Sequence, residues 1–140
     1  MDELSGYLGV LSINENECRL TMQSLHLTPL PINYSNIDIT NAAKTLAYNL
    51  SLNVDVHTPL GSATSNGKET SFAKSFDVNV AISTGAGDVW DAADIAGYLC
   101  ELEANERLMF ANACAAFYIS KIESPALFDV PKFLKSIGVR

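Results

Sequence analysis

Residues 83–93 read Ser83-Thr84-Gly85-Ala86-Gly87-Asp88-Val89-Trp90-Asp91-Ala92-Ala93, and this segment carries the strongest signal in the chain. Two glycines one residue apart allow a tight turn that exposes backbone N–H groups. Apolar residues then recur at helical spacing, which predicts that the turn opens a helix. The unpaired N–H groups at a helix start, together with the helix dipole, favour an anion at this point.

Asp88 stands in the first turn of this predicted helix, where the dipole favours the ionised carboxylate by about 0.3–1 kcal/mol. Such a turn beside a carboxylate suits phosphoryl transfer, because the turn holds phosphate charge while the carboxylate takes a proton from the attacking hydroxyl. The same residue types are also ordinary at a helix start, so a purely structural role for Asp88 stays open. A dinucleotide fingerprint does not fit, because Trp90 occupies its third glycine position.

Three segments, in order along the chain, resemble the ribokinase-like (PfkB) family of sugar and nucleoside kinases. The segment Thr84-Gly85-Ala86-Gly87-Asp88 resembles the family signature D-T-T-G-A-G-D. Upstream, Asn14 and Glu17 match an N-x-x-E pair that follows a strand, and downstream the segment 110–116 resembles an Ala-rich helix in which Asn112 is the asparagine. The resemblance covers about residues 8–137.

The resemblance implies ATP-dependent phosphoryl transfer to an alcohol group of a sugar or nucleoside, with Mg²⁺ bound to the ATP. It also implies the roles of individual residues. The implied roles are Asp88 as the catalytic base, the amides of Gly85, Ala86 and Gly87 as the anion hole, Gly61, Thr84 and Asn112 as nucleotide-binding residues, and Asn14 and Glu17 as organisers of Mg²⁺ through water.

Two of these assignments have structural alternatives. Asn14 is a good N-cap residue and Glu17 follows three positions later, so the pair is also the pattern of a capping box. Asn112 is predicted to be the polar interior member of an otherwise apolar helix over residues 107–119, where a hydrogen bond to a neighbouring loop would satisfy it.

The chain also departs from the family pattern. Ile82 replaces the acidic residue that opens the signature, Asp94 lies where the family has an apolar residue, and Thr64 replaces the second glycine of the block around Gly61. The segment Glu123-Ser124-Pro125 replaces a glycine-led loop that often helps to hold a monovalent cation. This last replacement argues against a potassium-type site.

The fold class that the resemblance implies is α/β, a ribokinase-like layered sheet with flanking helices. Residues 1–140 are predicted to form a single domain that resembles the nucleotide-binding and catalytic C-terminal half of the family fold. The sugar-binding and lid half is expected to be absent, so an acceptor would require a complementary half. The alternative function is a truncated, non-catalytic nucleotide-binding or assembly module.

The charge and the hydrophobic pattern of the chain argue against two classes of partner, nucleic acid and membrane. The net charge is −7 and the nine Lys and Arg residues are scattered, which argues against nucleic acid. No long apolar span and no basic-then-apolar leader occur, so neither a membrane nor a secretory route is predicted, and the expected location is the cytoplasm.

Cys18, Cys100 and Cys114 are predicted to be buried, reduced thiols. Asp91 and Asp94 are predicted to lie on a solvated helix face.

Periodicity and turn residues predict the elements. Strands are expected over residues 7–13 and 54–58, and a hairpin over 62–76 that turns at Ser65-Asn66-Gly67-Lys68. Helices are expected over 14–25, 42–50, 103–120 and 130–137, and from the glycine turn to about residue 102. The strand over 7–13 or that over 54–58 is expected to keep an unpaired edge or an uncovered face, which predicts a homo-oligomer.

Overall fold

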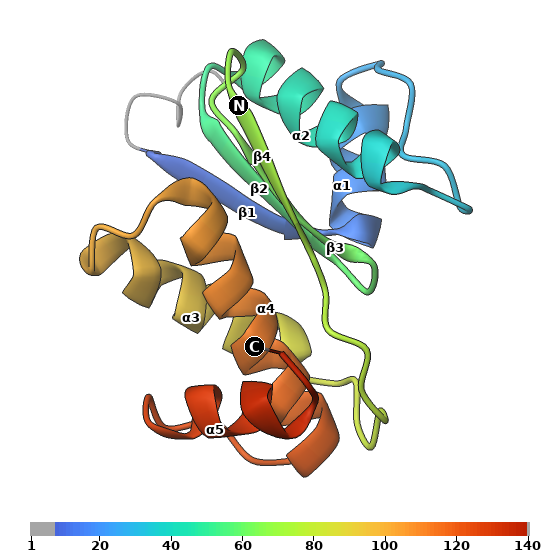
Figure 1. The fold of residues 1–140 in the computed structure, drawn as a ribbon. Helices are drawn as coiled ribbons and strands as arrows, with labels where there is room; N and C mark the ends of the chain where they lie inside the picture. Colours follow the sequence, from blue (N-terminus) through green and yellow to red (C-terminus); the bar gives the residue numbers. More distant parts are fainter. Residues whose placement is uncertain (1–7, 140) are drawn as a thin grey trace. The chain divides into compact units, whose positions relative to one another are not determined.

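The computed structural model describes residues 8–139, and the chain divides into two compact units (Figure 1). The first unit ends at Lys74 and holds a four-stranded sheet with two helices, and the second begins at Ser75 and holds three helices. This mixed architecture confirms the predicted α/β class. The assignment of residues 1–140 to a single domain stays a prediction.

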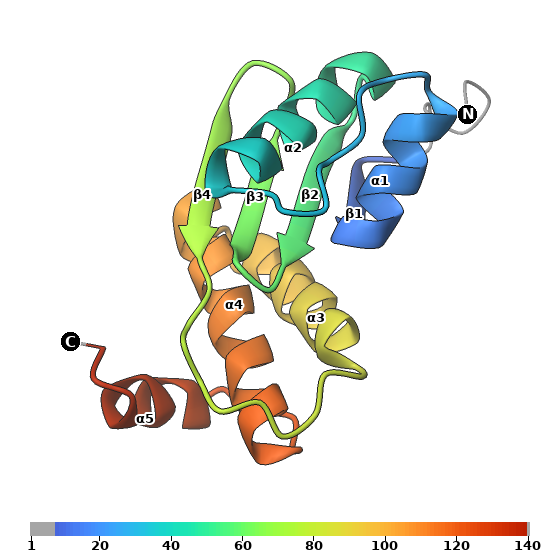
Figure 2. The ribbon, with the colours of Figure 1, turned by 90° about the vertical axis from the view of Figure 1, so that its right-hand side faces the viewer.

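The sheet of the first unit has the order β1-β2-β3-β4, in which β1 and β2 are parallel and the other pairs are antiparallel. Helices α1 and α2 connect β1 to β2 and lie on one face of the sheet (Figure 2). The elements are β1 (Val10–Asn14), α1 (Glu15–Ser24), α2 (Asn36–Leu50), β2 (Asn53–Thr58), β3 (Gly61–Ser65) and β4 (Thr70–Lys74).

The core of the first unit lies between the sheet and these two helices. Ile13, Val56 and Ala63 are opposite one another on three neighbouring strands, and all three are buried. Ile39 and Leu46 of α2 are fully buried in the same cluster. Side chains two positions apart on a strand share a face, so the alternation in β1 and β2 places the apolar set under the helices.

The second unit consists of α3 (Ala86–Leu99), α4 (Ala104–Lys121) and α5 (Asp129–Ser136). Helices α3 and α4 pack side by side as a helical hairpin, and α5 packs on α4 (Figures 1 and 2). Phe133 of α5 meets Phe117 of α4 edge to face, with ring centroids 5.4 Å apart. No helix within residues 8–139 is long and apolar enough to span a membrane.

The predicted elements are all present, with shifted ends. The first strand begins at Val10 and extends to Asn14, and Tyr7 lies outside the described residues. Helix α2 begins at Asn36, six residues before the predicted start, because Ser35 caps it in a capping box with Asp38. Hydrogen bonds from Ser35 hold the pKa of Asp38 below its ordinary value.

Three predictions about burial are wrong. Asp94 is buried rather than solvated, because it forms an ion pair with Arg107 of α4. Arg107 is therefore a second polar interior residue of that helix, beside Asn112. Cys100 is exposed, since it follows the last residue of α3. Cys18 and Cys114 are buried as predicted, and burial raises the pKa of each thiol to about 11.

Candidate functional site

The turn that opens α3 is built on Gly85. This residue caps the helix with a φ of +87°, a left-handed conformation that favours glycine. A Cβ at this position would lie 2.7 Å from the hydroxyl oxygen of Tyr118, so a side chain would also require Tyr118 to shift. The N–H of Ala86 donates to the carbonyl of Ser83 at 3.2 Å, and the N–H of Val89 donates to the carbonyl of Gly85. The sequence-predicted glycine turn is thus the true start of the helix.

The first turn of α3 leaves backbone donors available. Within residues 8–139, the N–H groups of Gly85, Gly87 and Asp88 have no hydrogen-bond partner, whereas that of Ala86 is already used within the turn. The Asp88 side chain is exposed and makes no capping hydrogen bond. Donors at a helix start beside an accessible carboxylate can hold an anion and accept a proton from a nearby hydroxyl.

Residues 81–84 are attached to the last turns of α4. The N–H groups of Ala81 and Ile82 both donate to the carbonyl of Ile119, at 2.7 and 3.2 Å. The hydroxyl of Tyr118 donates to the carbonyl of Thr84 at 3.0 Å. The Thr84 side chain is exposed, so this residue is tied to the protein through its backbone.

Asn112 lies in the buried interface between α3 and α4. Its Oδ1 accepts a hydrogen bond of 2.8 Å from Nε1 of Trp90, and only 5% of Asn112 is exposed. The partner of this oxygen is therefore a side chain of α3. Two of the predicted candidates, the signature turn and Asn112, are therefore joined by α3 itself, since Trp90 follows Asp88 by two residues.

A buried ion pair lies farther along the same interface. Arg107 donates to Asp94 Oδ1, and its guanidinium lies 3.8 Å from the centre of the Tyr98 ring. Gly97 makes room, because a Cβ there would lie 2.7 Å from Cγ of Arg107. Sequence reasoning missed Arg107 and Tyr118. The available signal for the pair was one Arg in a largely apolar helix, preceded by a helix with three Asp residues.

In the first unit, Asn14 and Glu17 form a complete capping box. Asn14 Oδ1 accepts from the N–H groups of Asn16 and Glu17, and Glu17 Oε2 accepts from the N–H of Asn14 at 2.9 Å. The structural alternative is thus present. It is compatible with a metal-organising role, since the box holds the exposed Glu17 carboxylate in one orientation. No cluster of three or more metal-ligating side chains occurs among the described residues.

Gly61 occupies the tight connection between β2 and β3. Its φ is +154°, and a Cβ would lie 2.5 Å from the carbonyl oxygen of Ala73 on β4. The hydroxyl of Thr58 donates to the Gly61 carbonyl and accepts from the Leu60 and Gly61 N–H groups. Glycine is therefore required here by packing, and Asn14, Glu17 and Gly61 all belong to the first unit, whereas the other candidates belong to the second.

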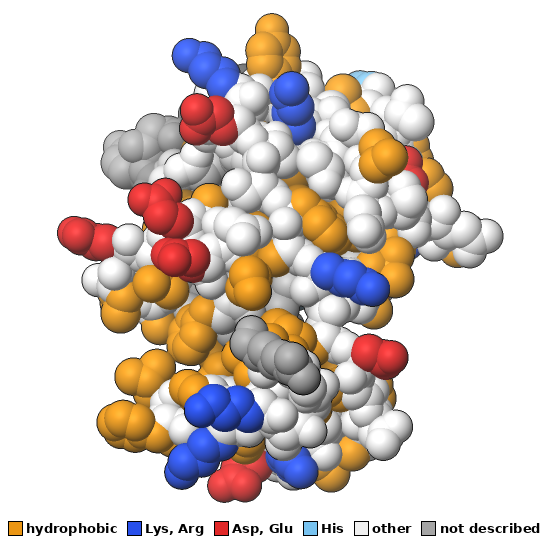
Figure 3. Space-filling model, in the orientation of Figure 1, with side chains coloured by type: hydrophobic (Ala, Val, Ile, Leu, Met, Phe, Trp, Pro, Cys, Tyr) orange, Lys and Arg blue, Asp and Glu red, His pale blue; other side chains and the backbone are white. Residues whose placement is uncertain are grey.

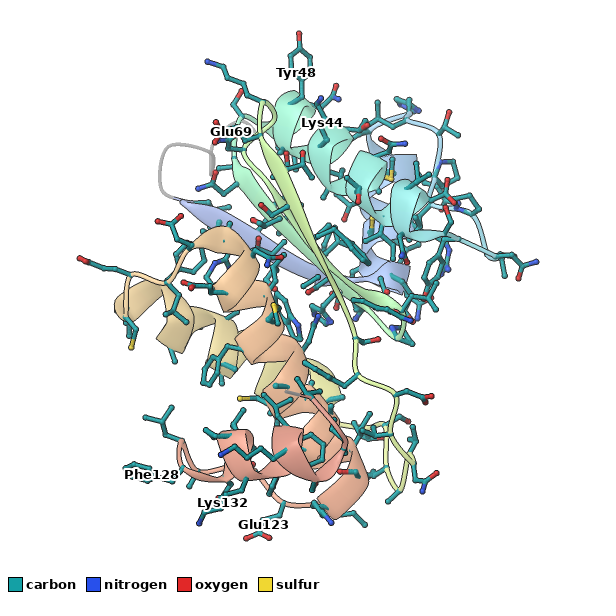
Figure 4. The ribbon with its side chains drawn as sticks, in the orientation of Figure 1. Lys44, Tyr48, Glu69, Glu123, Phe128 and Lys132 are labelled. Carbon is teal, nitrogen blue, oxygen red and sulfur yellow. The ribbon has the colours of Figure 1, made fainter. Side chains whose placement is uncertain are left out.

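An apolar groove of about 470 Å³ also lies in the second unit, between α4 and α5. Its walls include Met109, Phe110 and Leu134. Exposed hydrophobic side chains gather around α5, and Phe128, which is 79% exposed, projects outward close to Lys132 (Figures 3 and 4). None of the predicted site residues lines this groove.

Comparison with known proteins gives structural matches only. No family model and no curated protein sequence matches the chain. Ribokinase from Thermotoga maritima is 26% identical with a TM-score of 0.77, and the match covers 96% of this chain and 45% of that chain. Adenosine kinase from Sinorhizobium meliloti is 22% identical with a TM-score of 0.70, over 96% of this chain and 38% of that chain.

A ribokinase-like protein of Escherichia coli, in complex with ATP and Mg²⁺, is 22% identical with a TM-score of 0.68, over 96% of this chain and 42% of that chain. The chain thus spans less than half the length of these three structures. It carries part of the ribokinase-like fold, and its resemblance to the ribokinase-like (PfkB) family is confirmed.

Proposed function

We propose that this chain is the nucleotide-binding and catalytic part of a PfkB-type kinase that transfers a phosphoryl group from ATP to an alcohol group of a sugar or nucleoside. The observation that carries the proposal is the start of α3. There the unpartnered N–H groups of Gly85 and Gly87 adjoin the exposed Asp88 carboxylate, in a fold shared with ribokinase and adenosine kinase.

Each part of this turn has a chemical role in the proposal. The Gly85-Ala86-Gly87 backbone stabilises negative charge that develops on the transferred phosphoryl group, and the Ala86 N–H also closes the turn through Ser83. Asp88 accepts the proton of the acceptor hydroxyl, for which an exposed carboxylate in the first helical turn is suited. Thr84, Asn112 and Gly61 contribute to nucleotide binding, Asn112 through the buried interface in which it already meets Trp90.

The chain offers oxygen ligands for Mg²⁺ but no closed metal site among its described residues. That fits a hard cation that keeps most of its water and is held largely by phosphates. Asn14 and Glu17 would hold it through water, with Glu17 oriented by the capping box. The bound ion supplies charge neutralisation for the phosphates, which a chain of net charge −7 otherwise repels.

A non-catalytic nucleotide-binding or assembly module is the second candidate. The observation that favours it is coverage, since the chain matches at most 45% of the three kinase structures compared above. Ile82, which replaces an acidic residue of the signature, also favours the non-catalytic module. The kinase and a nucleotide-binding module both predict nucleotide binding, and they differ in whether phosphoryl transfer follows. An assembly module predicts neither.

Isothermal titration of the 140-residue chain with Mg-ATP is expected to show one binding site, and EDTA is expected to weaken the binding of ATP. The reason is that the acidic chain binds phosphates only when a divalent cation balances their charge. A phosphotransfer assay on a panel of sugars and nucleosides accompanies the titration. Binding without transfer favours the module, and transfer to any acceptor favours the kinase. No binding of Mg-ATP contradicts the kinase and the nucleotide-binding module, and leaves only the assembly module.

We also propose that the chain self-associates. Within residues 8–139, no strand pairs with the outer edge of β1, and an open apolar strand edge favours pairing with another chain. Multi-angle light scattering at micromolar concentration is therefore expected to give about twice the chain mass of 15.1 kDa. A dilution series serves as the control, because a dimer dissociates on dilution. A monodisperse monomer of 15.1 kDa at all concentrations would contradict the proposal.

A further inference from the structure

The polar contacts that join α3 and the turn before it to α4 include three that are spread along the helices. From the start of α3 onward these are Thr84 with Tyr118, Trp90 with Asn112, and Asp94 with Arg107. The residue numbers rise along α3 and fall along α4, as expected for an antiparallel helix pair. The first contact differs from the others, because it joins a side chain to the backbone of the signature turn rather than to another side chain.

The direction of one peptide group follows from that contact. The chain has no cis peptide bond within its described residues, so the carbonyl of Thr84 and the N–H of Gly85 point in opposite directions. Tyr118 donates to the carbonyl at 3.0 Å and therefore lies on the carbonyl side of this peptide plane. The Gly85 N–H is thereby directed away from Tyr118, and it has no hydrogen-bond partner among residues 8–139.

Backbone hydrogen bonds hold the residues on either side of this peptide. Before it, Ala81 and Ile82 are fixed by the carbonyl of Ile119, and after it the helix begins with the Ala86 and Val89 hydrogen bonds. Gly85 itself tolerates a wide range of backbone angles. Without the hydroxyl of Tyr118, rotation of the Thr84–Gly85 peptide would turn the carbonyl oxygen toward an incoming anion.

We propose that Tyr118 is a positioning residue for the phosphate-binding turn: its hydroxyl holds the Thr84–Gly85 peptide so that the Gly85 N–H faces the phosphates. This inference rests on the proposed function, because it assigns a purpose to the direction of that N–H. Tyr118 touches neither nucleotide nor acceptor in this scheme. It raises the fraction of the protein in which the turn is ready to bind, and apparent affinity scales with that fraction.

Tyr118→Phe tests the proposal, since it removes one hydroxyl and keeps the ring. The expected result is a loss of affinity of about threefold to tenfold for Mg-ATP and magnesium tripolyphosphate, the range that one hydrogen bond can supply. Adenosine binding is expected to stay unchanged, because adenosine carries no phosphate. Tyr48→Phe is the matched control, since Tyr48 is 77% exposed and points into solvent from α2 (Figure 4).

A second measurement needs no ligand. In NMR spectra of the ligand-free chain, Tyr118→Phe is expected to shift the carbonyl signal of Thr84 and the amide signal of Gly85, while Tyr48→Phe leaves both in place. A Gly85→Ala variant adds a test of the same contact, because its Cβ would lie 2.7 Å from the Tyr118 oxygen but 3.3 Å from ring carbon Cζ. The added methyl group should therefore weaken Mg-ATP binding less in the Tyr118→Phe background than in the natural one.

The outcomes separate the two proposals. No binding of Mg-ATP to the unsubstituted chain overturns the proposed function, whatever the spectra show. Unchanged Thr84 and Gly85 signals in Tyr118→Phe overturn the positioning role, and so does an equal loss of affinity for adenosine and Mg-ATP, which would indicate a general structural effect.

Discussion

Asp88→Asn is expected to lower phosphoryl transfer by at least about 100-fold while leaving the affinity for Mg-ATP nearly unchanged. The substitution keeps the shape of the side chain and removes its capacity to accept a proton. Asp88 is exposed and makes no capping hydrogen bond within the described residues, so its loss should not disturb the turn. The measurement is steady-state turnover together with titration of Mg-ATP.

The assay uses the chain supplemented with the portion of Thermotoga ribokinase that the chain does not match, because less than half of that fold is represented here. Asp77→Asn is the control, since it makes the same chemical change at an exposed position outside the motif. If Asp88→Asn weakens the affinity for Mg-ATP while turnover at saturating Mg-ATP persists, Asp88 has a binding role and its assignment as the base fails.

The parts of the site that could be predicted from sequence are those in which interacting residues are close along the chain. The glycine turn and its helix lie within one short segment, and the Asn14–Glu17 capping box joins residues three positions apart. Such spacings are set by helix geometry and need no knowledge of the tertiary fold. The same reasoning placed the start of α2 at residue 42 and so missed its capping residue, Ser35.

What sequence could not provide is the set of contacts between α3 and α4. Tyr118 and Thr84 are 34 residues apart, and Trp90 and Asn112 are 22 apart. Their pairing depends on the rotation of each helix about its axis, which a hydrophobic pattern determines only coarsely. Asp94 was misjudged for the same reason. As a charged residue on an amphipathic helix it resembled a surface residue until its partner on the next helix was known.

Arg107→Met is expected to reduce the free energy of unfolding of the second unit by about 3–5 kcal/mol, the largest effect on stability predicted for this chain. Arg107 and Asp94 are 2% and 3% exposed, so removing the guanidinium takes the positive charge of a buried ion pair away from the Asp94 carboxylate. The substitution also removes the contact with the Tyr98 ring. A loss of this size is a large share of the stability of a typical small protein, which is about 5–15 kcal/mol.

Urea unfolding followed by fluorescence reports on this unit, because Trp90 is the single tryptophan of the chain and is buried between α3 and α4. Lys132→Met is the matched control, since it removes a positive charge from an exposed position and should change stability by less than about 0.5 kcal/mol. The double variant Asp94→Leu/Arg107→Met removes both charges, so it should recover most of the loss. If the double variant is as unstable as Arg107→Met, shape and packing around Gly97, rather than an unpaired charge, account for the effect.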